Sequence, residues 1–166
     1  MYALLRRIVR TGIRSEPAPA RTEDDRIADH LDEAIRHRLG RALAIRYVDA
    51  GSCNACELEV QALANPYYNL EGYGIRFVAS PRHADALMVS GPVSKHMAIA
   101  LKRTYDATPD PKFVIAVGDC ARGCGILAAN YATCAKVADV IPVDIEVPGC
   151  PPSPSALLRA ILAAVR

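Results

Sequence analysis

Six cysteines are the residues of this 166-residue chain whose type and spacing could do chemistry. Cys53 and Cys56 form a CxxC pair after a strand-like run, whereas Cys120 and Cys150 are single. Each single cysteine follows an apolar, β-branched run and lies in a loop marked by Gly or Pro. Because the carboxyl ends of strands in an open α/β sheet share one edge where ligands bind, we expect these four thiolates to converge there. Four convergent thiolates predict a metal centre.

Different centres use a CxxC pair, and the distances along the chain help to separate them. The pair alone indicates a redox dithiol or half of a zinc site. A dithiol would leave Cys120 and Cys150 without a role, and a structural zinc site usually takes two close pairs. Here 63 residues lie between Cys56 and Cys120, and 29 lie between Cys120 and Cys150. This soft, widely spaced set favours an iron–sulfur cluster, with a zinc-stabilised interaction module as the alternative.

The two other cysteines have less telling contexts. Cys124 lies in a Gly-rich turn close to Cys120. Cys134 falls within residues 126–135, which we predict to be a short helix, and is expected to be a small core residue.

Composition narrows the class of protein. The length favours one domain with a real core, and a net charge of +2 gives no broad basic surface for nucleic acid. No stretch approaches the roughly 18–20 apolar residues of a membrane span. The twin arginine Arg6-Arg7 lacks a following apolar segment, which argues against a secretory signal and for a reducing compartment. A mitochondrial transit peptide remains an alternative for the Arg-rich start.

The first 40 residues differ from the rest. Residues 1–14 predict an amphipathic helix, with Met1, Leu4, Leu5, Ile8, Val9 and Ile13 on one side and Arg6, Arg7, Arg10 and Arg14 on the other. Such a helix binds either a membrane surface or a partner subunit. Residues 17–20 predict a stiff linker, and residues 23–39 a polar helix with Ile27, Leu31, Ala34 and Ile35 on one stripe. We therefore expect an extension over 1–40 and a cluster-binding α/β domain over 41–166.

The elements that must position the cysteines alternate in type along residues 41–166. Strands are predicted over 42–48, 75–79, 86–89, 112–117 and 140–147, and helices over 53–64, 94–105, 126–135 and from Pro154 onward. Ser153 is the expected N-cap of the last helix, with Pro154 at its first position. Alternating strands and helices predict a parallel sheet covered on both faces.

Four ordered motifs in this region carry a family resemblance. CNACELEV (53–60), SPRHAD (80–85), GDCARGCGI (118–126) and IPVDIEVPGCPPSPSALL (141–158) together resemble the small cluster-bearing subunit shared by complex I and the membrane-bound nickel–iron hydrogenases. The resemblance implies a flavodoxin-like α/β sheet and a single 4Fe–4S cluster at the carboxyl ends of the strands. It also implies that the ligands are Cys53, Cys56, Cys120 and Cys150. Family members usually have glycine at the position of Cys124, so the resemblance implies that Cys124 lies near the cluster without binding it.

The spacing of the first motif bears on the branch of this family. The complex I subunit carries two adjacent cysteines there, whereas Cys53 and Cys56 are separated by two residues, as in the hydrogenase and formate hydrogenlyase subunits. The same resemblance implies that Arg82 and His83 lie near the cluster, where Arg82 would bind cluster sulfur or a partner or form only a surface salt bridge. Glu57 and Glu59 are candidates for a proton path, although Glu57 also suits a helix N-terminus.

The resulting hypothesis is an electron-transfer subunit with no bond-making chemistry of its own. It would pass electrons between the clusters of a ferredoxin-like iron–sulfur subunit and the nickel–iron site of a hydrogenase large subunit, with a complex I-type quinone site as the alternative. Apolar residues around Val60 and Leu63 are expected to be exposed and to bind the large subunit. The N-terminal helix would attach to membrane subunits, which predicts a peripheral position on the cytoplasmic face of the inner membrane.

Overall fold

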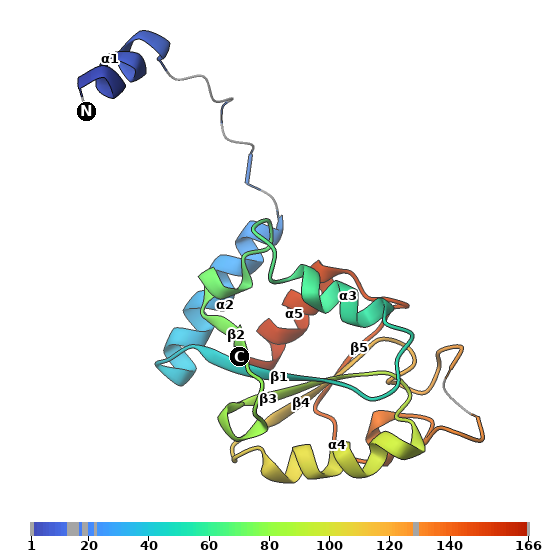
Figure 1. Cartoon of the computed structure of the whole chain (residues 1–166). Coiled ribbons are helices and arrows are strands. Elements are labelled where there is room, and N and C mark those ends of the chain that lie inside the picture. Colours follow the sequence, from blue (N-terminus) through green and yellow to red (C-terminus); the bar gives the residue numbers. More distant parts are fainter. Residues whose placement is uncertain (1, 13–16, 18–19, 22, 128–129, 166) are drawn as a thin grey trace.

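The computed structural model is an α/β fold built on one parallel sheet, and it describes residues 2–12, 17, 20–21, 23–127 and 130–165 (Figure 1). The sheet has the order β2-β1-β3-β4-β5, with β1 (Leu43–Asp49), β2 (Ile75–Phe77), β3 (Ala86–Ser90), β4 (Phe113–Val117) and β5 (Ile145–Val147). Strand order 2-1-3-4-5 is that of flavodoxin-like folds. The predicted fold class is therefore confirmed.

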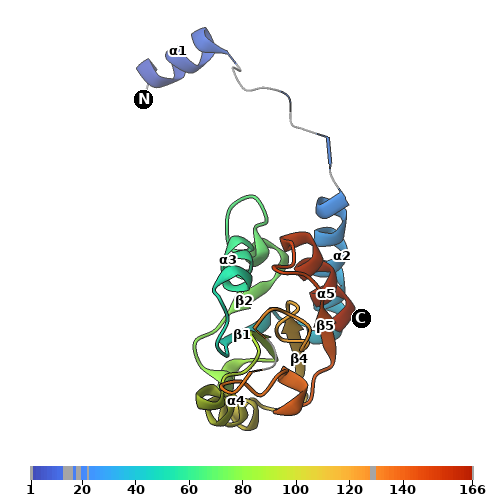
Figure 2. The ribbon, with the colours of Figure 1, turned by 90° about the vertical axis from the view of Figure 1, so that its right-hand side faces the viewer.

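Helices cover both faces of this sheet. The α-helices are α1 (Tyr2–Thr11), α2 (Glu23–Leu39), α3 (Ala55–Ala62), α4 (Lys95–Ala107) and α5 (Pro154–Val165), and short 3-10 turns span Leu70–Tyr73, Pro81–His83 and Val137–Asp139. In both views α4 lies on the face opposite α3 and α5 (Figures 1 and 2). Side chains alternate accordingly, so Ala86 and Met88 of β3 join the core under α2, α3 and α5, while Leu87 and Val89 join the core under α4.

Helix α2 belongs to the packed α/β unit. Its predicted stripe is buried, with Ile27 8%, Leu31 0% and Ile35 1% exposed, in the same core as residues of α5. Arg159 of α5 also donates to Glu23 at 2.9 Å. Since α2 buries its apolar face on the sheet domain, we propose that this domain begins with α2 rather than at residue 41.

Helix α1 lies apart from the sheet in both views (Figures 1 and 2). Every residue of Tyr2–Thr11 is exposed. The helix confirms the predicted amphipathic segment over these residues, whereas Met1, Ile13, Arg14 and part of the expected linker lie outside the described residues. Within the described part of the chain, no helix combines the length and the apolar character needed to cross a membrane.

The helix predicted over residues 126–135 is wrong for the residues that the structure describes there. These residues form turns, and Thr133 makes an isolated antiparallel bridge to Ser94 at the start of α4. The side chain of Asn130 bonds the backbone at Leu127 and Ala132, so local side-chain bonds replace helical ones. Cys134 is half-buried against the core under α4, as expected. It lies in a loop and not in a helix, and its own N–H donates to the carbonyl of Val93.

The last strand is shorter than predicted. It spans only Ile145–Val147, because the N–H groups of Val140 and Ile141 both donate to the carbonyl of Val137 and close a turn. Pro142 then offers no N–H for a ladder. Ser153 does cap α5, since its Oγ accepts from the N–H of Ala156 at 3.3 Å.

Candidate iron–sulfur site

The first cysteine-bearing loop follows β1. The carboxylate of Asp49 accepts the N–H groups of Gly51 and Ser52 at 2.9 and 2.8 Å, which turns the chain as the strand ends. Cys53 then lies exposed before α3, and Cys56 is buried in the first turn of α3 with 9% of its surface exposed. The CxxC pair thus places an exposed cysteine just before α3 and a buried cysteine in its first turn.

The second and third loops extend the pairing of β4 and β5. The N–H of Gly118 donates to the carbonyl of Val147 at 2.8 Å, and the N–H of Asp119 donates to the carbonyl of Gly149 at 2.9 Å. The bond from Gly118 continues the parallel pairing of Val117 with Val147, and the bond from Asp119, the very next residue, adds a further link beyond the regular ladder. Cys120 and Cys150 therefore follow two adjacent strand ends that are bonded to one another.

The three loops meet at Gly118. A Cβ added there would lie 2.6 Å from the Sγ of Cys56 and 3.3 Å from the carbonyl oxygen of Gly149, and the residue has a φ of +86°, so only glycine fits. Burial first, and then the charges of Cys53, Cys120 and Cys150, raise the pKa of the Cys56 thiol to about 11. The thiols of all four predicted ligands are thus close enough to interact electrostatically.

The donor set suits an iron–sulfur cluster. Thiolates are the ligands of such clusters, and four of them hold a 4Fe–4S unit. A Cβ at Gly125 would collide with the Sγ of Cys120, so glycines lie against two of the sulfurs and leave no side chain beside them. Among the residues that the structure describes, no group of three or more His, Cys, Asp and Glu side chains could hold a single metal ion as it stands.

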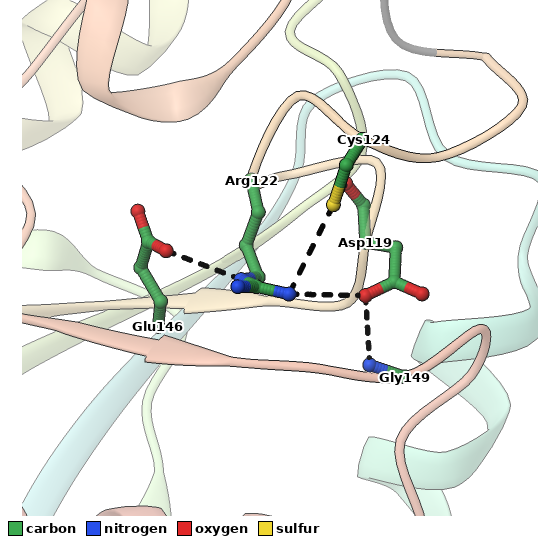
Figure 3. Close-up of polar contacts among 5 residues, drawn as sticks. All are labelled: Asp119, Arg122, Cys124, Glu146 and Gly149. Atoms are coloured by element: carbon green, nitrogen blue, oxygen red, sulfur yellow. Dashed lines mark hydrogen bonds and ion pairs between the residues drawn. The ribbon is translucent and has the colours of Figure 1, made fainter.

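An ionic network that the sequence did not predict joins the second and third loops (Figure 3). We call it the Asp119 brace, and it comprises Asp119, Arg122, Glu146 and Gly149. One carboxylate oxygen of Asp119 accepts the N–H of Gly149 at 3.0 Å and a guanidinium N–H of Arg122 at 3.3 Å. Arg122 also donates to Glu146 on β5 at 3.1 Å. The brace therefore ties the segment before Cys120 to the segment before Cys150.

Cys124 lies beside this brace. Its Sγ is 3.5 Å from the carbonyl oxygen of Asp119 and 3.9 Å from Nη1 of Arg122 (Figure 3). The N–H of Cys124 also donates to the same carbonyl at 3.0 Å. Cys124 is thus held by the second loop itself, four residues after the expected ligand Cys120.

The two glutamates of α3, Glu57 and Glu59, lie close to the cysteine pair in sequence. Glu57 lies in the first turn, half-buried, and accepts from the side chain of Gln61 at 3.2 Å. Its charge also acts on Tyr47, whose pKa is raised chiefly by burial. Glu59 is half-buried on the same helix. Glu57 is therefore next to the cysteine site, and its place near the helix N-terminus is favourable for a carboxylate in any case.

Arg82 and His83 lie at the opposite edge of the sheet from the cysteines. They line a hollow of about 760 Å³ together with Arg41, Lys112 and Asp144, which precede β1, β4 and β5. Residues that precede parallel strands lie at the amino edge, whereas the cysteines follow strands and lie at the carboxyl edge. The expectation that Arg82 and His83 lie beside the cluster is therefore wrong, because their motif leads into β3 rather than out of it.

The expected partner-binding surface on α3 also needs correction. Val60 and Leu63 are 3% and 0% exposed, and both belong to the core under α2, α3 and α5. The large apolar side chain that α3 exposes is Leu58, at 58%. The predicted helix is present, but Val60 and Leu63 face the core instead of a partner.

The geometry defines a class of protein: a flavodoxin-like α/β fold whose cysteines gather at the carboxyl edge of the sheet. A model of the family "NADH ubiquinone oxidoreductase, 20 Kd subunit" matches residues 53–164, which include all four expected ligands. The chain belongs to this family. Members of the family are known to bind iron–sulfur clusters.

Two relatives and one solved structure show what this chain resembles. The chain is 43% identical over 127 residues to the probable membrane-bound hydrogenase subunit mbhJ of Pyrococcus furiosus, covering 76% of each protein. It is 37% identical over 142 residues to formate hydrogenlyase subunit 7 of Escherichia coli, covering 86% of this chain and 55% of that protein. A solved chain of the membrane-bound sulfane sulfur reductase, an archaeal respiratory membrane complex, aligns with a TM-score of 0.67 and 29% identity over 87% of this chain and 75% of that one.

Proposed function

We propose that this chain is an electron-transfer subunit of a membrane-associated oxidoreductase complex, with one 4Fe–4S cluster on Cys53, Cys56, Cys120 and Cys150. The observation that carries the proposal is the meeting of three cysteine-bearing loops at Gly118, where the Sγ of Cys56 leaves no room for a Cβ. When bound, the cluster supplies reversible one-electron transfer. The chain's own part is to hold four thiolates at one edge of a rigid sheet.

Ligation is tested by iron and acid-labile sulfide analysis of protein purified without oxygen. Replacing Cys120 or Cys150 by Ser should lose or badly damage the cluster, since each supplies one of four ligands. Cys134→Ser is the control, because this thiol packs against the core under α4 and is not one of the four expected ligands. Unchanged iron content in both Cys120→Ser and Cys150→Ser would refute the ligand set. A colourless protein that contains zinc would favour the zinc-stabilised module.

We further propose that the complex belongs to the hydrogenase branch. The subunit would then pass electrons between a ferredoxin-like iron–sulfur subunit and a nickel–iron large subunit, at the cytoplasmic face of the inner membrane. Two relatives are named as subunits of a membrane-bound hydrogenase and of formate hydrogenlyase, and two residues separate Cys53 from Cys56, as in that branch.

A second candidate is a complex I-type subunit that passes electrons to a quinone, and the family description favours it. The purified complex separates the two candidates. Hydrogen evolution from a reduced low-potential dye, with nickel found by elemental analysis, supports the hydrogenase branch. Quinone reduction without nickel or hydrogen activity moves the chain to the complex I branch.

A further inference from the structure

Helix α1 carries an unusual share of the exposed apolar surface. Ten large apolar side chains are exposed in the described residues, and five of them lie on this ten-residue helix. Their exposed fractions are 82% for Tyr2, 62% for Leu4, 56% for Leu5, 57% for Ile8 and 83% for Val9. Contiguous exposed apolar surface of this kind marks a contact with another surface.

The apolar and charged side chains of α1 are fully separated around the helix. At about 100° per residue, the five apolar side chains span an arc of about 160°, and Arg6, Arg7 and Arg10 fall within an arc of about 100° on the other side. Arg6 directly follows the edge of the apolar arc at Tyr2. The long stems of arginines at such a border cover apolar surface while the guanidinium groups reach outward.

The charge of α1 has a single sign. The helix contains three arginines and no acidic residue, whereas the whole chain has a net charge of only +2. The rest of the chain therefore carries one more acidic than basic residue, and the positive excess is concentrated on α1. An anionic surface therefore complements this helix.

A helix of this length is marginal on its own in water, where about 12–15 residues are needed even for good helix formers. We propose that α1 lies on the surface of a membrane that contains anionic phospholipids, with its apolar face among the acyl chains and its arginines on the lipid phosphates. Guanidinium groups bind phosphate oxygens in pairs of hydrogen bonds, and a short, charged, strongly amphipathic helix is typical of this interfacial position. The inference deepens the proposed function, because it names lipid as a partner of the peripheral subunit.

Charge favours lipid over a protein groove as the occupant. A helix that docks its apolar face in a groove leaves its polar face in solvent, where acidic and basic residues serve equally well. On a flat anionic surface, by contrast, both flanks of the apolar face meet phosphates, and acidic residues would be repelled. The absence of acidic residues from α1 therefore matches the second case.

The test uses the full chain and one introduced fluorophore. The sequence contains no Trp, so Tyr2→Trp places the chain's sole tryptophan on the apolar face. With vesicles of phosphatidylcholine containing about a third phosphatidylglycerol, we expect a blue shift of its emission, co-sedimentation of the protein, and a loss of both at high salt. Pure phosphatidylcholine vesicles should bind at least roughly tenfold more weakly, because about 1 kcal/mol per basic residue is lost.

Two further variants of the Tyr2→Trp protein separate the apolar and the charged contributions. Ile8→Glu should abolish vesicle binding, and its control is Ile99→Glu, which changes an equally exposed isoleucine on α4. Replacing Arg6, Arg7 and Arg10 together by Gln should weaken binding to anionic vesicles by roughly tenfold or more.

The inference is overturned if the full chain does not bind anionic vesicles, or if neither Ile8→Glu nor the arginine replacements reduce binding. A blue shift that occurs only with detergent-solubilised membrane subunits overturns lipid in favour of a protein groove. Iron content is measured on the same samples. Lost vesicle binding with an intact cluster refutes this inference alone, and vesicle binding without any cluster refutes the proposed function alone.

Discussion

Replacing Gly118 by Ala should destabilise the protein through a contact that the structure identifies. The new Cβ would lie 2.6 Å from the Sγ of Cys56, and the backbone φ is +86°. The left-handed backbone costs a non-glycine residue about 1–2 kcal/mol, and forcing a methyl group into a packed site costs a further 1–3 kcal/mol. We therefore expect the free energy of unfolding of the metal-free protein to fall by about 2–5 kcal/mol.

Gly40→Ala is the matched control. Gly40 ends α2 with a φ of +62°, and no atom lies within 4 Å of the Cβ that Ala would add. This variant bears the backbone strain without the collision. The excess of Gly118→Ala over Gly40→Ala, about 1–3 kcal/mol in urea denaturation, therefore measures the contact at Cys56.

A double-mutant cycle shows whether the sulfur causes this excess. Cys56→Ala removes the Sγ, so the cost of Gly118→Ala should fall in that background by more than about 1 kcal/mol. Equal costs for Gly118→Ala and Gly40→Ala, or an excess that persists without the sulfur, would refute the placement of Cys56 against Gly118. The convergence of the three loops would then lose its main support.

Two other predictions concern the same loops. Asp119→Ala leaves the N–H of Gly149 without its acceptor and Arg122 without one of its two carboxylates. The free energy of unfolding, measured by urea titration, should therefore fall by about 2 kcal/mol. The control is Asp106→Ala, which removes an exposed 3.6 Å ion pair on α4 and should change the free energy of unfolding by less than about 0.5 kcal/mol. In metal-free protein near pH 8, iodoacetamide should alkylate Cys53 before Cys56, because burial and a pKa raised from 9.0 to about 11 leave the Cys56 thiolate about a hundredfold scarcer than at an ordinary thiol. The order is read by mass spectrometry of peptides after increasing times, and faster labelling of Cys56 would contradict its burial.

Local signals predicted the elements that carry the cysteines. The β-branched runs before Cys120 and Cys150 have the composition of buried strands, and a Gly follows each run, so the sheet edge could be predicted from the chain alone. The stripe of α2 was equally clear, and Leu31 and Ile35 are buried as it indicates. The same periodicity did not say which surface each helix faces, and for that reason Val60 and Leu63 were expected to be exposed.

Non-local contacts account for what the sequence did not show. The brace exists only because β4 and β5 are neighbours, which places Arg122 beside Glu146, 24 residues later in the chain. The signal for Asp119 was present, since an acidic residue directly before a cysteine at a strand end is a candidate acceptor for neighbouring N–H groups. Residues 126–135 contain good helix formers, but Thr133 pairs with Ser94, and this pairing competes with a helix.

Backbone hydrogen bonds link each of the three loops to a neighbouring strand or loop. Ala50 donates to Ser90, Gly118 to Val147 and Asp119 to Gly149, so each loop is fixed by the strand beside it. Such a site differs from a zinc finger, in which the metal supplies the folding free energy. A cysteine-to-serine variant at Cys120 or Cys150 should therefore lose iron while keeping its unfolding midpoint close to that of the metal-free parent. This separation makes iron content a measure of ligation rather than of folding, and a midpoint far below that of the metal-free parent would show that the serine disturbs the fold itself.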